Sequence, residues 1–224
     1  MALTVNHKEN ESYLGDKPLL KLARDKSFSE LIFTLLAERE PTKWELSVFE
    51  LILNISIDHG PETPSAKAVI EKSKDGGSIV EAVAAGVREI NDVHGGAQEA
   101  LMPILYKIVK EKLSAENIVK EFVENKKRLP GFGHRLYKEN DPRAELIIAT
   151  LVENGLGEDY ITASRALQKS LKDITGKTLP LNIDGAIAIV LCAFGLSPEL
   201  GKPIFMIART PGLCAHYLNN KAVN

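Results

Sequence analysis

The chain has 224 residues, of which 44% are hydrophobic and 26% are charged, and its net charge is −2. This length and composition suit a globular protein that buries a real core, in one large domain or two small ones. The charge balance and the lack of a long basic run argue against nucleic acid as the main partner. No apolar stretch approaches the roughly 18–20 residues of a membrane span, so no membrane partner is expected.

The termini and cysteines point to a cytoplasmic location. Residues 1–16 are polar and lack the apolar segment of a signal peptide. Cys192 and Cys214 lie in apolar surroundings without the spacing of metal ligands, which predicts reduced, buried thiols. Since no Cys-x-x-Cys or His-x-x-x-His pattern occurs, we expect no metal site.

Helical periodicity dominates the chain in order. Ser27 and Glu30 form a capping-box pattern that predicts a helix ending at 40–42, and a second helix continues to Asp58. Ser78 opens a third helix, whose small residues suggest close packing against another helix. Further helices are predicted at 95–113, 114–127, 142–152, 159–174, 185–194 and 198–208, joined by short Gly and Pro breaks. The alternation of a sheet protein is absent, so we predict an all-α fold.

The segment between residues 129 and 143 carries the densest set of chemically useful residues. It reads Leu129-Pro130-Gly131-Phe132-Gly133-His134-Arg135, followed by Asp141-Pro142-Arg143. The glycines permit a tight turn whose backbone can approach a ligand. The histidine titrates near neutrality, and the arginines suit carboxylate or phosphate. The segment is therefore either an anion site or a solvated surface turn with an incidental histidine.

Other candidate residues lie where predicted helices begin or end. His59 stands where a helix stops, and His94 precedes a helix whose N-terminal dipole favours a neutral imidazole. Asp184 is either the N-cap of the next helix or a desolvated base. Arg209 is either paired internally or directed into a cleft. For His216 we expect a packed core or interface position.

In chain order, these segments resemble the citrate synthase superfamily over about residues 28–217. The residues that carry the resemblance are His59-Gly60, His94-Gly95-Gly96-Ala97, the segment from Gly131 to Lys138 with Asp141-Pro142-Arg143, Asn182-Ile183-Asp184-Gly185, and Ala208-Arg209-Thr210. The resemblance implies an all-α, two-domain fold and a homodimer. Its large domain would comprise residues 1–95 and 196–224, and a smaller domain, 96–195, would close over coenzyme A (CoA).

The resemblance also implies roles for individual residues. His94 would hydrogen-bond the thioester carbonyl and stabilise an enolate, and Asp184 would move a proton at the acetyl methyl group. His134 would polarise the oxaloacetate carbonyl, or handle the hydroxyl proton of the citryl group in the reverse direction. Such chemistry needs enolate stabilisation as the proton moves, because a carboxylate alone is too weak a base.

Substrate contacts are implied in the same way. Arg143 and Arg209 would clamp a dicarboxylate, and His59 would help to hold it. CoA would lie against Lys126, Arg128, Leu129, Pro130, Gly131, Phe132 and Gly133. The CoA thioester is then substrate or product, and no tightly bound cofactor is expected.

The direction of the reaction depends on a few departures within the family. Asp58-His59-Gly60-Pro61 and the ending 208–216 resemble citryl-CoA lyases, whereas His94 is typical of citrate synthases. The segment after His216 lacks the arginine that synthases supply from a neighbouring subunit. The resemblance therefore favours cleavage of citryl-CoA to acetyl-CoA and oxaloacetate, with a citryl-CoA synthetase as a possible partner. Citrate synthesis is the alternative, and a catalytically silent CoA-binding relative is the third.

Overall fold

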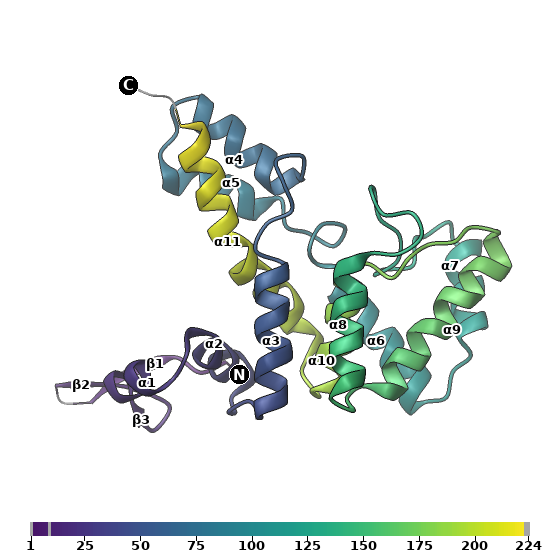
Figure 1. Cartoon of the computed structure of the whole chain (residues 1–224), viewed down its shortest axis with the longest axis horizontal. Coiled ribbons are helices and arrows are strands. Elements are labelled where there is room, and N and C mark those ends of the chain that lie inside the picture. Colours follow the sequence, from purple (N-terminus) through teal and green to yellow (C-terminus); the bar gives the residue numbers. More distant parts are fainter. Residues whose placement is uncertain (1, 9, 222–224) are drawn as a thin grey trace. The chain divides into compact units, whose positions relative to one another are not determined.

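A computed structural model describes residues 2–8 and 10–221 (Figure 1). The described chain is mainly helical, as the sequence predicts, and it divides into two compact units between Leu51 and Ile52. None of its described helices is long and apolar enough to cross a membrane.

The first unit begins with a small antiparallel sheet that the sequence analysis missed. Its strands are β1 (Val5–Lys8), β2 (Glu11–Leu14) and β3 (Lys17–Pro18), in the order β1-β2-β3. Every residue of β1 is exposed, so no alternation of buried and exposed side chains marks it as a strand. Helices α1 (Leu19–Asp25) and α2 (Phe28–Ala37) follow, and α3 (Lys43–Ile55) carries the chain into the second unit. The predicted capping box of Ser27 and Glu30 is confirmed at the start of α2.

The second unit holds the remaining helices. They are α4 (Pro64–Lys74), α5 (Ile79–Arg88), α6 (Ala97–Lys110), α7 (Ala115–Glu124), α8 (Pro142–Glu153), α9 (Glu158–Thr175), α10 (Ile183–Ala193), a 3-10 turn (Pro198–Leu200) and α11 (Gly201–Asn220). Helix α10 is buried over nearly its whole length and packs against α6, α8 and α9 (Figure 1). A fully apolar helix is the expected centre of such a layer.

A second packing group joins α4, α5 and α11 around Val69, Ala82 and Leu213. The predicted close packing of α5 is confirmed, since a Cβ on Gly86 would lie 2.8 Å from the carbonyl oxygen of Ser65. The sequence analysis missed α4, and it ended the last helix at 208. That helix instead runs through Pro211 to Asn220, because packing of its apolar face outweighs one missing N–H.

Candidate active site

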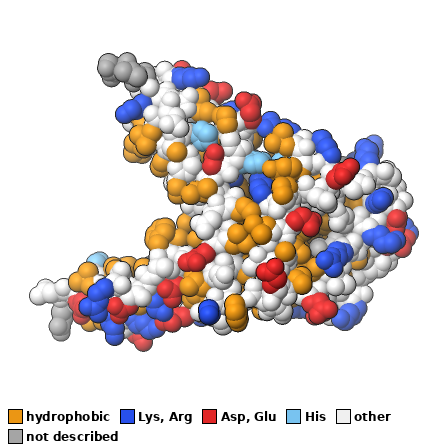
Figure 2. Space-filling model, in the orientation of Figure 1, with side chains coloured by type: hydrophobic (Ala, Val, Ile, Leu, Met, Phe, Trp, Pro, Cys, Tyr) orange, Lys and Arg blue, Asp and Glu red, His pale blue; other side chains and the backbone are white. Residues whose placement is uncertain are grey.

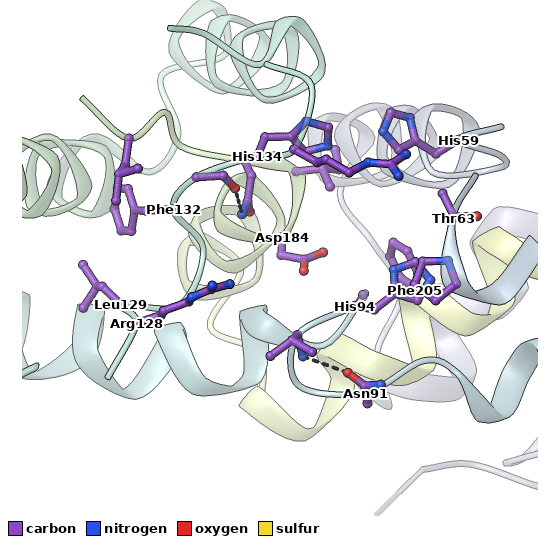
Figure 3. Close-up of a pocket in the computed structure, with 18 of the residues that line it drawn as sticks. His59, Thr63, Asn91, His94, Arg128, Leu129, Phe132, His134, Asp184 and Phe205 are labelled. Carbon is purple, nitrogen blue, oxygen red and sulfur yellow. Dashed lines mark hydrogen bonds between the residues drawn. The ribbon is translucent and has the colours of Figure 1, made fainter. Parts of the chain in front are cut away.

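A cavity of about 1240 Å³ opens within the second unit, where several helix ends and loops meet (Figure 3). It brings together six of the residues singled out from the sequence: His59, His94, His134, Arg143, Asp184 and Arg209. In Figure 3, Asp184 lies in the middle of the site, with His134 and His59 on one side and His94 on the other. Segments more than 100 residues apart in the sequence therefore contribute to a single pocket.

Asp184 is the most buried acid of the cavity. The N-cap of α10 is Asn182, whose side chain accepts from the Gly185 N–H, so the N-cap interpretation of Asp184 is wrong. Its carboxylate instead accepts backbone N–H groups of Gly95 and Ala97 at the start of α6, and its Oδ1 has no partner. Burial raises the pKa of Asp184 to about 6. This arrangement suits a group that gains and loses a proton near neutrality.

His94 faces the cavity from the turn that precedes α6. Backbone hydrogen bonds with Asn91 close this turn, and the ring Nε2 lies 3.0 Å from the hydroxyl of Ser65. The ring also meets Phe205 edge-on. Burial, reinforced by the charge of Arg209, lowers the pKa of His94 to about 4. The imidazole is therefore neutral at physiological pH.

His134 is held in a single tautomer by the backbone that follows it. Its Nδ1 accepts N–H groups from Leu136 and Tyr137, both at 3.1 Å, and the ring stacks on Tyr137. A neutral ring whose Nδ1 accepts must carry its proton on Nε2. That Nε2 lies 3.2 Å from Nη2 of Arg143. Two donors side by side leave room for an oxygen atom that both can bind.

Arg143 owes its orientation to a buried acid. Asp141 is fully buried, caps α8, and binds Arg143 through Nε at 2.9 Å and Nη2 at 2.7 Å. Burial alone would raise the pKa of Asp141, but the hydrogen bonds and charge of Arg143 bring it below its usual value. The pair fixes a guanidinium at the cavity wall.

Arg209 and His59 complete this wall. Arg209 is 2% exposed, donates from Nε to the Ser56 carbonyl at 2.8 Å, and leaves Nη1 without a partner. Both alternatives for Arg209 therefore apply, because it is bonded internally and also lines the cavity. The ring of His59 lies 5.3 Å from that of His134. Burial, then the charges of Arg143 and His134, lower the pKa of His59 to about 4.

The glycine turn is bound to the segment that leads into Asp184. The Gly131 carbonyl accepts the Asn182 N–H at 3.0 Å, and the Gly133 carbonyl accepts the Asn182 side-chain amide at 2.9 Å. Both glycines have positive φ values, +80° and +86°, which favour glycine. Since Gly131 is buried and tied in this way, the interpretation as a solvated surface turn is wrong.

The residues expected to contact CoA are only partly at the cavity. Its wall includes Arg128, Leu129, Phe132 and Gly133, but Lys126, Pro130 and Gly131 are not among the described residues that line it. Lys177 and Phe205 line it and were missed, as was the Ser65 contact to His94. Ser65 lies in the unpredicted helix α4, and no local pattern marks a lysine after the end of α9. Among the described residues, no group of three His, Cys, Asp or Glu side chains is placed to hold a metal ion.

Comparison with known proteins identifies the fold. The family model described as citrate synthase, C-terminal domain, matches residues 1–224. The citrate synthase of Synechocystis sp. is 32% identical over 200 residues, covering 85% of this chain and 49% of that protein. This chain thus spans about half the length of the curated relatives it matches.

Two solved structures have the same fold. The citryl-CoA lyase of Hydrogenobacter thermophilus superimposes with a TM-score of 0.90 and 36% identity, covering 98% of this chain and 86% of that one. The ATP citrate lyase of Methanosaeta concilii, in complex with (3S)-citryl-CoA, gives a TM-score of 0.87 at 22% identity, covering 98% and 38%.

Proposed function

Because this chain belongs to the citrate synthase family, we propose that it is a citryl-CoA lyase that cleaves citryl-CoA to acetyl-CoA and oxaloacetate. The observation that carries the proposal is the unpartnered oxygen of buried Asp184, which shares one cavity with neutral His94 and with the paired donors of His134 and Arg143. The choice of a lyase is supported by similarity to the Hydrogenobacter enzyme, of which this chain covers 86%.

Cleavage breaks the bond between the thioester methylene and the carbinol carbon. The hydroxyl oxygen becomes the carbonyl of oxaloacetate, and Nε2–H of His134 and the guanidinium of Arg143 stabilise the negative charge that develops there. Because both donors already carry protons, the hydroxyl proton passes to the neutral ring of His59. Substrate carboxylates bound at Arg143 and Arg209 would cancel the positive charges that depress the pKa of His59, making it a better base.

The bonding electrons pass to the thioester, which becomes an enolate. His94, neutral and directed into the cavity, donates to the enolate oxygen, and protonated Asp184 delivers its proton to the carbon to give acetyl-CoA. A carboxyl group with a pKa of about 6 can serve as this acid, and in the opposite direction as the base. CoA would extend along Arg128, Leu129 and Phe132, with Lys177 available to its phosphates.

Citrate synthesis is the second candidate, favoured by the presence of His94 in the cavity and by relatives named citrate synthase. The decisive experiment supplies purified protein with citryl-CoA, then with acetyl-CoA and oxaloacetate. Free oxaloacetate from the first reaction, with negligible CoA release from the second, supports the lyase, and the reverse pattern supports a synthase. If neither reaction proceeds and deuterium does not exchange into the acetyl-CoA methyl group, the chain is a silent CoA-binding relative.

The assembly belongs to the same proposal. Residues 96–195 would form the smaller domain that closes over CoA, and 1–95 with 196–224 the larger one. Helix α5 exposes Val80 by 75% beside a groove lined by Val83, Val87 and Cys214, which supports a homodimer formed through this face. Figure 2 shows hydrophobic side chains over this end of the second unit. Light scattering should give twice the chain mass of 24.6 kDa.

A location in the cytoplasm and a separate synthetase as the source of citryl-CoA complete the proposal. If a synthetase supplies the substrate, adding it with citrate, CoA and ATP to the purified chain should yield oxaloacetate. Omission of either protein should abolish the product.

A further inference from the structure

The segment that leads to His59 is held by one face of the last helix. On α11, Arg209 donates from Nε to the Ser56 carbonyl at 2.8 Å. One turn further along, a Cβ on Gly212 would lie 2.2 Å from the Ile57 carbonyl oxygen, so helix and segment are in direct contact there. Spacings of three and four residues place such positions on a single helical face.

The third position on this face is His216. Its Nε2 lies 2.9 Å from Oδ1 of Asp58. The same carboxylate accepts the Gly60 N–H through Oδ2 at 3.1 Å and also accepts the His59 N–H. Asp58 therefore holds the turn around His59 from within, while His216 holds Asp58 from α11. Gly60 has a φ of +80°, so the turn depends on a conformation that these hydrogen bonds help to fix.

We propose that His216 is a positioning residue that, through Asp58, places the ring of His59 against the reacting hydroxyl group. The inference rests on the proposed function and extends it to residues outside the site. Asp58 and His216 do not belong to the set of described residues that line the cavity, whereas His59 does. Arg209 lies on the same face of α11, so one helix positions both a substrate cation and the proton acceptor.

The pair is suited to orientation more than to stability. The Asp58 side chain is 39% exposed and that of His216 is 14% exposed. Pairs with such exposure contribute little to folding because water screens them. A displacement of about 1 Å in a reacting group, in contrast, can reduce a rate by about 100-fold. Loss of His216 should therefore change turnover much more than it changes the melting temperature.

The test compares His216→Leu with His216→Gln, since a glutamine amide can donate from nearly the same place as Nε2. We expect His216→Leu to reduce kcat for citryl-CoA cleavage by about tenfold or more, to leave CoA affinity unchanged, and to be largely rescued by glutamine. Asn220→Ala is the matched control. It removes a side-chain hydrogen bond to the His216 carbonyl on the same helix without touching Asp58, and it should retain activity.

A double-mutant cycle with His59→Ala completes the experiment. If His216 acts through His59, His216→Leu should cause no further loss in the His59→Ala background. A kcat within twofold of wild type, an equal loss in both backgrounds, or a parallel loss of CoA affinity would each overturn the inference. Wild-type protein inactive on both substrate sets would refute the proposed function instead. Citrate affinity measured by calorimetry, expected to fall about tenfold in His216→Leu, then still decides the inference.

Discussion

Two buried aspartates should respond to the same substitution with opposite changes in stability. Asp184 and Asp141 both lie at the start of a helix and are 7% and 0% exposed. Arg143 binds Asp141 with two hydrogen bonds, whereas one oxygen of Asp184 has no partner. Asp184→Asn should therefore stabilise the fold near neutral pH, and Asp141→Asn should destabilise it.

The magnitude for Asp184 follows from its pKa. Burial raises this pKa from 3.8 to about 6, and each unit corresponds to about 1.4 kcal/mol. Above pH 6 the ionised carboxyl therefore reduces the free energy of unfolding by up to about 3 kcal/mol. The penalty develops as pH rises from 3.8 to 6 and is absent below this window. An asparagine removes it and can still accept the Ala97 N–H, so we expect a gain of about 1–3 kcal/mol at pH 8, together with a 10²–10⁴-fold loss of kcat.

For Asp141 the sign is reversed. A pKa held below its usual value contributes stability that is present at neutral pH and is lost as pH falls through that pKa. Asp141→Asn leaves the buried guanidinium of Arg143 without its anion, which costs about 3–5 kcal/mol in comparable pairs.

Urea unfolding of both variants and wild type at pH 4 and pH 8 measures these effects. Each kcal/mol should move the melting temperature by about 2–4 °C in a chain of this size. The gain of Asp184→Asn should shrink toward pH 4. The reasoning is refuted if Asp184→Asn destabilises the protein at pH 8, or if its effect is independent of pH.

Three further predictions follow from the same geometry. The kcat/KM for cleavage should fall as pH rises through about 6, where Asp184 loses the proton it donates, while methyl deuterium exchange should rise over the same range. Gly185→Ala should weaken CoA binding by calorimetry and lower stability, although alanine favours helices, because its Cβ would lie 2.5 Å from the Gly131 carbonyl oxygen. A thiol reagent should label Cys214 but not native Cys192, which is 2% exposed and whose pKa burial raises to about 12.

Local chemistry explains which parts of the fold could be predicted from sequence. Ser27, Ser78 and Ser114 each accept a backbone N–H at the predicted helix start, because capping is decided within four residues. The sheet at residues 5–18 escaped prediction since pairing between short, exposed strands leaves no apolar pattern. Helix α4 is the opposite case. Its Pro64 and Thr63 are typical N-terminal residues, but its exposed lysines and glutamates obscure the buried face of Ser65, Ala66 and Val69.

The candidate site was predictable in its membership but not in its electrostatics. Residue types at helix ends suggested His94, His134 and Asp184, and the cavity contains all three. The sequence could not give the tautomer of His134, because that depends on backbone N–H groups two and three residues later. Nor could it give the cap of α10, since asparagine and aspartate both cap helices and lie two residues apart.

The distribution of charge around the cavity gives these residues their complementary roles. Positive charge resides on Arg143 and Arg209, and their fields, added to burial, keep His59 and His94 neutral. Of the two buried acids, Asp141 spends its charge on Arg143, which leaves Asp184 free to exchange a proton. Nη1 of Arg209 is buried and unpartnered, so an anionic substrate group at that point would satisfy a donor that the fold leaves open. A dicarboxylate could thus be bound by two arginines of a single chain, without an arginine from the C-terminal segment of a neighbouring subunit.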